Sequence, residues 1–353
     1  MEETMRRRTF LGIGAGALLA AARPGVAADA PAPAAISPEL LAAARKEAKV
    51  VWYTSVDLQV GERIARAFEA KYPGVPVQVE RSGAERIFQR LAQERGSNIR
   101  VADIVNSSDA AHFIIWKRDG WLAPYVPEDV ARHYAAEHKD PDGMFATWRA
   151  SLSVIGYNTR LVKPEDAPKG FADLLDPRWT GRIVKAHPGY SGTILTATFQ
   201  TARDLGWQYF EQLAKQRVMQ VQSATDPPKK IAIGERPVMA DGAEYTLLLL
   251  KEAGSPVEVV YPVEGTPFVA GPSGIFVDAP HPNAARLFQS YLFSAEAQQA
   301  LVDVGGLRSL HPLTKEKAGR RPIREIRLMK EDAKAVEEQV EAIKQQYTRY
   351  FRT

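Results

Sequence analysis

The clearest alternation of apolar and polar positions lies between Val50 and Phe68. Val50–Tyr53 is an unbroken run of β-branched and aromatic residues, which is typical of a buried strand. Thr54–Asp57 is short and polar, and an apolar series at helical spacing then runs from Val60 to Phe68. A strand that leads into a helix through such a loop points backbone N–H groups and polar side chains above the sheet. We therefore predict one side of a ligand cleft here.

The same succession of strand, polar loop and helix recurs along the first part of the chain. A predicted strand at Val75–Glu80 precedes an amphipathic helix at Ser82–Glu94. Another predicted strand, Ala102–Val105, leads through Asn106–Asp109 into a helix that continues to Lys117. This alternation predicts an α/β fold with a mostly parallel sheet covered by helices, and ligands at the carboxyl ends of the strands.

The second part of the chain repeats this pattern after a long extended run at residues 145–158. A second extended run, 268–278, has the character of a return crossing. We therefore predict two lobes, each a mixed sheet flanked by helices, joined by extended crossing segments. The predicted division places residues 38–146 and 275–320 in lobe 1 and residues 147–274 in lobe 2. Residues 321–353 would form a C-terminal helix that braces the lobes.

The N-terminus has the pattern of an export signal. Arg6, Arg7 and Arg8 precede a short apolar stretch, and a twin-arginine pair before such a stretch resembles a Tat signal. We predict a Tat-like signal peptide over residues 1–28, cleaved after Ala27 or Ala28, and a Pro/Ala linker over 29–37. The stretch is shorter than the roughly 20 residues that a membrane span needs. The mature protein is therefore expected to be periplasmic.

Charge and composition narrow the function further. The formal charge is +4, and residues 1–27 contain four arginines and two glutamates, so cleavage would leave about +2. No stripe of basic residues interleaved with aromatics is present, so we expect no nucleic-acid partner. The chain has no cysteine, which excludes thiolate metal sites, thiol nucleophiles and disulfides.

Several polar loops at predicted strand ends are candidate ligand-binding sites. At a helix N-terminus free N–H groups favour an anion, although a Ser, Thr or Asp there can simply cap its own helix. Arg149, in the first crossing segment, could hold a carboxylate or phosphate with two hydrogen bonds, or form a surface salt bridge. The candidates are Tyr53, Ser55, Asp57, Ser107, Ser108, Arg149, Ser191, Gly192, Thr193, Asp241, Glu244 and Tyr245.

Ser191 also allows a different class of function. The sequence from Gly189 to Thr193 imitates a nucleophile elbow but lacks its final glycine. His281 and His311 are available as catalytic partners only by their position in the chain. An exported serine esterase is therefore an alternative, and its test is ester hydrolysis that Ser191→Ala abolishes. No HExxH motif is present, which argues against zinc chemistry.

From about residue 48 to 312 the chain resembles the extracytoplasmic substrate-binding proteins of ABC importers, specifically the ferric-iron-type family. The similar segments are VVWYTSVD, ADIVNSSD, GWLAPY, SVIGYNTRLV, FADLLDPRWTGRIV, GYSGT, HPNAARLFQSYLFSAEAQ and GGLRSLHP. The resemblance implies a type 2 periplasmic-binding fold that closes two lobes over a ligand. It also implies a monomer without cofactor or enzymatic activity, which delivers its ligand to a membrane permease and ATPase.

Two departures from this family concern the ligand. Iron binders of the family commonly carry adjacent tyrosines where this chain has Glu244-Tyr245, and a histidine or similar ligand where it has Ser55-Val56-Asp57. The Ser191-Gly192-Thr193 turn, which holds an anion in such relatives, is retained. We therefore predict a small anionic or zwitterionic ligand bearing a phosphate, phosphonate or carboxylate. The alternative is ferric iron bound by Tyr245, Glu244 and Asp57 with a synergistic anion.

Overall fold

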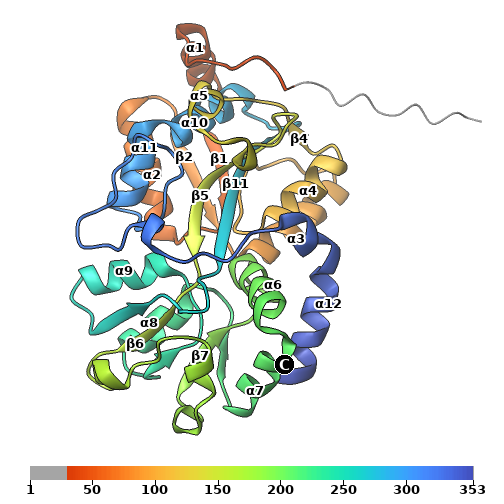
Figure 1. Cartoon of the computed structure of the whole chain (residues 1–353). Coiled ribbons are helices and arrows are strands. Elements are labelled where there is room, and N and C mark those ends of the chain that lie inside the picture. The colour runs from red at the N-terminus through yellow and green to blue at the C-terminus, as the bar shows by residue number, and fades with distance from the viewer. Residues whose placement is uncertain (1–29, 353) are drawn as a thin grey trace, which may run out of the picture.

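The computed structural model describes residues 30–352, which form two α/β lobes stacked one above the other (Figure 1). Lobe 1 contains a six-stranded sheet in the order β2-β1-β3-β11-β4, with β5 paired to β11. The strands β1, β2 and β3 are parallel, whereas β11 runs antiparallel to β3, β4 and β5. The sheet comprises β1 (Val50–Thr54), β2 (Val77–Arg81), β3 (Ile104–Asn106), β4 (Leu122–Ala123), β5 (Ala146–Leu152) and β11 (Phe268–Phe276).

Helices cover both faces of this sheet. Trp52 of β1 is fully buried, and its ring packs against Trp148 and Phe288 at centroid distances of 5.7 and 5.2 Å. Phe68 of α2 contacts the same Phe288 ring, which joins the opening strand–loop–helix unit to the later helix α10. The helices are α1 (Pro38–Glu47), α2 (Leu58–Lys71), α3 (Ala84–Gly96), α4 (Ala110–Arg118), α5 (Glu128–His133), α10 (Pro282–Phe293) and α11 (Ala295–Asp303).

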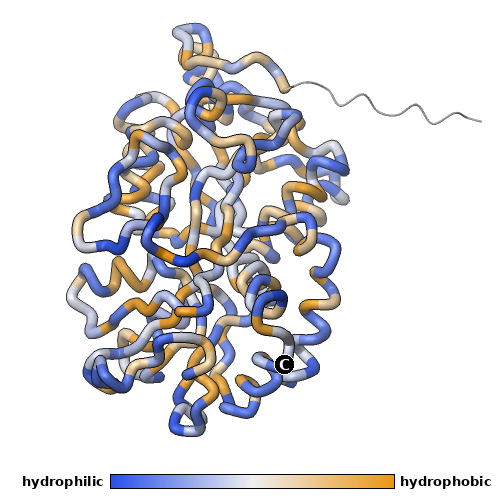
Figure 2. The backbone as a smooth tube through the Cα atoms, in the orientation of Figure 1, coloured by the Kyte–Doolittle hydropathy of each residue, from blue (hydrophilic) through white to orange (hydrophobic). Residues whose placement is uncertain are grey.

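Lobe 2 is built on a five-stranded mixed sheet in the order β10-β6-β9-β7-β8. In both lobes the more apolar stretches lie inward and the most hydrophilic ones lie on outer helices and loops (Figure 2). The strands are β6 (Ile155–Asn158), β7 (Ile183–Ala186), β8 (Met219–Val221), β9 (Val238–Met239) and β10 (Val257–Val260). The helices are α6 (Gly192–Leu205), α7 (Trp207–Lys215), α8 (Asp226–Ala232) and α9 (Glu244–Glu252).

Two extended segments connect the lobes, as the sequence predicted, but the lobe boundaries differ from those expected. β5 and β11 pair from Phe268–Leu152 to Ser273–Ala146, so both strands belong to the lobe 1 sheet along their length. The chain therefore passes between lobes near residues 153 and 267 instead of 147 and 274. The difference arises because the long β5–β11 ladder extends the first sheet up to the crossing point.

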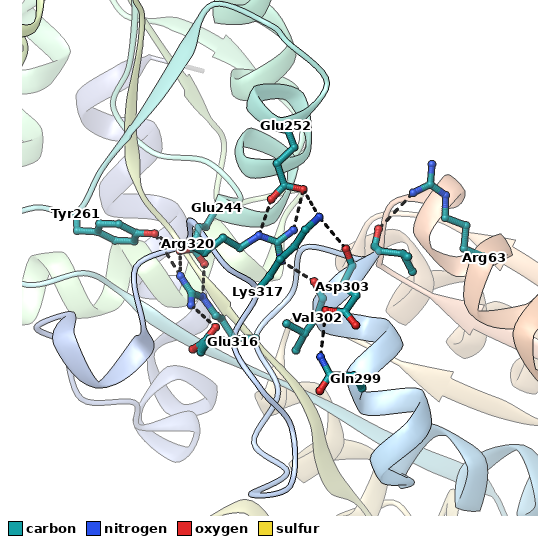
Figure 3. Close-up of polar contacts among 12 residues, drawn as sticks. Arg63, Glu244, Glu252, Tyr261, Gln299, Val302, Asp303, Glu316, Lys317 and Arg320 are labelled. Atoms are coloured by element: carbon teal, nitrogen blue, oxygen red, sulfur yellow. Dashed lines mark hydrogen bonds and ion pairs between the residues drawn. The ribbon is translucent and has the colours of Figure 1, made fainter.

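The segment after α11 crosses from lobe 1 to lobe 2 and is held by charged contacts (Figure 3). Arg320 donates to both carboxylate oxygens of Glu252 in α9 and to the carbonyl of Val302 in α11. Lys317 also donates to Glu252 and to the Asp303 carbonyl. The chain then ends in α12 (Ala333–Phe351), which lies along both lobes, from the level of α3 to that of α7 (Figure 1).

At the N-terminal end, the predicted signal peptide lies outside the described residues. Within the predicted linker, Ala34 donates its backbone N–H to Val126 and accepts from Glu128, so part of this segment is fixed to lobe 1. No helix among residues 30–352 is both long and apolar enough to cross a membrane.

Candidate functional site

A small cavity of about 20 Å³ lies between the two lobes, at the ends of the strands where ligand loops were predicted. Lobe 1 contributes residues that follow β1, β2 and β3, and lobe 2 contributes the turns before α6, α8 and α9. The lining residues are Ser55, Arg81, Gly83, Ala84, Ser108, Arg149, Tyr190, Ser191, Thr193, Ser223, Ala224, Thr225, Ala243 and Tyr245.

Arg149 of β5 is a buried cation in this cavity without a carboxylate partner. Its side chain is 2% exposed, and its guanidinium donates to the hydroxyls of Ser151 at 2.5 Å and Ser55 at 3.3 Å. Its Nε is buried without an acceptor. Burial lowers the pKa of Arg149 to about 10, and proximity to Tyr245 offsets this only in part. A buried charge costs free energy unless it is paired, so the site is prepared for an anion.

Arg81, the last residue of β2, is a second cation in the cavity lining. It donates to the Val56 carbonyl at 3.3 Å and to the Ser223 hydroxyl of lobe 2 at 3.2 Å. Neither Arg81 nor Arg149 forms an ion pair among the described residues, and the cavity lining contains no aspartate or glutamate. The lining is otherwise rich in hydroxyl groups, which can donate to the oxygens of an anion.

Helix N-termini from both lobes add to the positive potential of the cavity. Gly83 and Ala243 precede α3 and α9, and neither helix has a side-chain cap for its first turn. Ser191 caps α6 by accepting from the backbone N–H of Ile194 at 3.4 Å. Helix N-termini carry unpaired N–H donors and a partial positive charge, so their convergence favours an anion.

Tyr245 and Asp57 close one side of the cavity. The Asp57 backbone N–H donates to the Tyr245 hydroxyl at 3.1 Å, from lobe 1 to lobe 2. Burial raises the pKa of Tyr245, although Arg149 partly counteracts this. The Asp57 carboxylate caps α2 and pairs with Lys229 of α8 at 3.2 Å, so it lies in the groove outside the cavity.

Comparisons with known proteins agree with this arrangement. The family model of bacterial extracellular solute-binding proteins matches residues 100–322. The chain belongs to this family. The predicted resemblance to the substrate-binding proteins of ABC importers is confirmed.

Relatives of this solute-binding protein span most of its length. A Haemophilus influenzae protein of undescribed function is 26% identical over 289 residues, covering 79% of this chain and 82% of its own. A probable ABC transporter periplasmic-binding protein of Sinorhizobium fredii is 24% identical and covers 69% of each chain.

Solved structures share its fold. The periplasmic binding protein AfuA from Actinobacillus pleuropneumoniae, with fructose-6-phosphate bound, has a TM-score of 0.78 at 23% identity, covering 86% of this chain and 98% of its own. Iron-bound HitA from Pseudomonas aeruginosa has a TM-score of 0.72 at 21% identity, covering 85% of this chain and 99% of its own. The predicted type 2 periplasmic-binding fold is therefore confirmed.

The structure brings half of the predicted site residues to the cavity. Those that line it are Ser55, Ser108, Arg149, Ser191, Thr193 and Tyr245. Gly192 lies beside it, where a Cβ would come within 2.6 Å of Asp109 Cβ in lobe 1, so a glycine is required for the lobes to approach here.

Glu244 and Asp241 do not line the cavity of the solute-binding protein, which corrects the prediction for both. The Glu244 carboxylate is 1% exposed and accepts two hydrogen bonds from Arg308 at 2.6 and 3.1 Å. It accepts another from the Tyr261 hydroxyl. Asp241 pairs with Lys185 at 2.5 Å and accepts from the Ala186 N–H within lobe 2. These carboxylates are held by cations of the protein and are not available to a ligand.

Tyr53 and Ser107 also lie outside the cavity lining. The Tyr53 hydroxyl donates to Glu94 of α3 at 2.8 Å, so it is engaged within lobe 1. Ser107 is fully buried and accepts from the Asp109 backbone N–H in the turn before α4.

The sequence analysis missed Arg81, Tyr190, Ser223 and Thr225 in the cavity lining. Arg81 is the last residue of a strand, as Thr54 is, and this position could have identified it as a residue near the ligand site. Ser223 and Thr225 precede α8, which begins at Asp226-Pro227-Pro228 and was not predicted.

The alternative of a serine esterase receives no support from the geometry of its proposed partners. His281 interacts with Asp103 at 2.9 Å, and His311 faces Asp129 and His133 in lobe 1. Ser191 instead caps α6 at the cavity wall, where its hydroxyl and the following N–H groups face the interlobe space.

Proposed function

We propose that this protein is the periplasmic binding component of an ABC importer, and that it captures a small oxyanion between its lobes for delivery to a membrane permease and its ATPase. The anionic group would be a phosphate, phosphonate or carboxylate. The ligand would stabilise the closed arrangement by contacting residues of both lobes at once.

The observation that carries this proposal is Arg149. It is a buried guanidinium without a counter-ion, in a cavity whose lining has a second arginine and no carboxylate. An oxyanion would pair with both arginines from lobe 1 and accept from the Ser191–Thr193 turn of lobe 2. The fructose-6-phosphate of AfuA is an example of a phosphate ligand on the same fold.

The zwitterionic form of the prediction has less support. A ligand ammonium group would need a carboxylate partner, but of the predicted site residues Asp57 pairs with Lys229 and Glu244 pairs with Arg308. We therefore favour an anion whose remaining part is neutral and can hydrogen-bond to the serine and threonine hydroxyls.

Ferric iron is the alternative ligand, and the iron-bound HitA structure shows that the fold can hold it. Only Tyr245 of the three expected iron ligands lines the cavity, and its hydroxyl lies beside the cationic Arg149. Fe³⁺ prefers anionic oxygen ligands, so a site with two arginines and no carboxylate disfavours it.

The test is a binding panel by isothermal titration calorimetry on ligand-free protein. The panel contains inorganic phosphate, a sugar phosphate, a phosphonate, a dicarboxylate and ferric citrate. The proposal predicts saturable 1:1 binding of at least one oxyanion, with a matching increase in thermal stability. Binding of Fe³⁺ with a visible tyrosinate-to-iron band, and of no oxyanion alone, would contradict it.

A further inference from the structure

The C-terminal helix α12 follows the residues matched by the family model and is anchored to lobe 2 through its last turns. Tyr347 is fully buried, and its hydroxyl donates to Gln220 at 2.7 Å. Its ring lies 6.2 Å from that of Phe210 and is stacked on Phe351 at 4.3 Å. These contacts fix the end of α12 to lobe 2.

One turn earlier, α12 reaches across to lobe 1. Lys344 Nζ donates to Glu85 Oε2 at 2.9 Å. Glu85 is the second residue of α3, and the preceding Gly83 and Ala84 line the ligand cavity. Lys344 itself lies in an outer groove and not in the cavity lining. The ion pair therefore connects the lobes directly behind one wall of the site.

Lys344 also balances a buried charge cluster in lobe 1. Glu85 Oε1 lies 3.1 Å from His112 Nε2, and Asp109 Oδ2 lies 3.6 Å from the same nitrogen. Burial alone would raise the pKa of Glu85, but His112 and Lys344 together lower it to about 2. Burial raises the pKa of Asp109, whereas Glu85 is held ionised, and Lys344 supplies a second positive charge directly to the Glu85 carboxylate.

When the lobes separate, α12 is expected to stay with lobe 2 and Lys344 to leave Glu85. α12 packs on α6 and α7 of lobe 2 through Leu195, Phe199 and Trp207. It has fewer contacts with lobe 1, where it meets α4 at Ala111 and through the Arg118–Glu337 ion pair. Losing the ion pair exposes the cluster's negative charge, so the contact favours the closed arrangement.

We propose that Lys344 is a positioning residue for ligand capture, which favours lobe closure through Glu85 without contacting the ligand. It raises the fraction of closed protein before a ligand binds and so raises affinity. Replacing it is expected to lower affinity about tenfold, within the 5- to 150-fold range typical of such coupling.

The test measures lobe separation directly by pulsed electron spin resonance. Because the chain has no cysteine, two spin labels can be placed uniquely by Arg66→Cys on α2 and Lys215→Cys on α7, whose side chains are 63% and 70% exposed. Lys344→Met is compared with Lys334→Met, a control on the same helix that is 80% exposed and pairs with Glu338 one turn further along.

In ligand-free protein, Lys344→Met should shift the distance distribution toward longer distances, whereas Lys334→Met should leave it unchanged and Lys344→Arg should preserve the closed fraction. Glu85→Gln weakens the same contact from lobe 1 and should give the same shift, which keeps the test valid if Lys344→Met folds poorly. Unchanged distributions in folded Lys344→Met and Glu85→Gln, or an equal shift in Lys334→Met, would overturn the proposal.

Affinity for inorganic phosphate is measured on the same variants by calorimetry. This second readout rests on the proposed oxyanion function, but the ligand-free distances do not. A shift in distances with no phosphate binding by any variant would therefore leave the role of Lys344 intact and count only against inorganic phosphate as the ligand.

Discussion

Two equally buried arginines provide a test of how the site is prepared for an anion. Arg149 and Arg308 are each 2% exposed. Arg149 faces the cavity with only hydroxyl partners, whereas Arg308 pairs with Glu244 at 2.6 Å and Glu316 at 2.8 Å. The substitutions Arg149→Met and Arg308→Met remove the same charge and similar volume, but we predict that only the second strongly destabilises the protein.

The size of each change in the free energy of unfolding follows from the groups that contact each arginine. Burial lowers the pKa of Arg149 from 12.5 to about 10, and at about 1.4 kcal/mol per pH unit this is roughly 3 kcal/mol of unfavourable free energy. Its two hydrogen bonds to hydroxyls are worth about 1.5 kcal/mol each because the donor is charged, and their loss offsets the gain from removing the buried charge, so Arg149→Met should change the free energy of unfolding by less than about 1 kcal/mol. Arg308→Met leaves Glu244 buried and unpaired and should lower that free energy by about 3–5 kcal/mol.

For ligand affinity we expect the larger effect from Arg149→Met and the smaller one from Arg308→Met. Two charge-assisted hydrogen bonds are worth about 1.5–3 kcal/mol each, so Arg149→Met should weaken oxyanion binding by roughly 10²-fold or more. Folded Arg308→Met should bind within about threefold of the unchanged protein, because Arg308 does not line the cavity.

Urea unfolding of ligand-free protein gives the stabilities, and calorimetric titration gives the affinities. The outcome that contradicts this prediction is an Arg149→Met protein that is destabilised as strongly as Arg308→Met and still binds the oxyanion with unchanged affinity. That result would mean that Arg149 is a structural cation and not part of the ligand site.

Three further predictions concern Gly271, Ser191 and Glu331. Gly271→Ala should weaken anion binding about tenfold, as judged by calorimetry, because a Cβ there would meet the Arg149 side chain at 2.9 Å and displace it. Ser191→Ala should weaken binding several-fold with no ester hydrolysis in either protein; turnover lost in the variant would favour the esterase. The third prediction concerns Glu331. Burial raises its pKa to about 7, and Asp109 and Asp332 add to the rise, whereas the hydrogen bond from the Ala270 N–H lowers it. Glu331 therefore binds a proton more readily in the folded state than in the unfolded state. Stability should therefore fall as pH rises from about 4.5 through 7, and urea titrations of Glu331→Gln should show less of this fall.

The opening strand–loop–helix was predictable because its determinants are local. Val50–Thr54 is buried at every position, and Asp57 caps α2 by accepting from the Gln59 backbone N–H. The apolar run and the capping residue are both contained in one short stretch of sequence, so the pattern indicates the strand and the start of the helix before their distant packing partners are known.

The direction of individual side chains was not predictable in the same way. Glu244 stands one residue from Tyr245, but its partner Arg308 is 64 residues further along the chain. Only the fold brings them together, and that pairing removes Glu244 from the site. Arg149 was identified as a candidate, but only the folded structure shows that its neighbours are serine hydroxyls and that its Nε has no acceptor.

The helix α8 shows a different limit of sequence analysis. Asp226-Pro227-Pro228 has the character of a chain break, yet proline is well suited to the first turn of a helix because its missing N–H has no partner there. With α8 unpredicted, Ser223 and Thr225 were not recognised as part of a strand-to-helix loop facing the cavity.

The most direct test of the central claim is to identify what the purified protein carries. The protein is isolated without added ligand and denatured, and the released material is analysed by mass spectrometry together with the metal content of the sample. We expect a phosphate-, phosphonate- or carboxylate-bearing molecule, at up to one per chain, without stoichiometric iron. Stoichiometric Fe³⁺, or a neutral or cationic solute in place of an oxyanion, would contradict it.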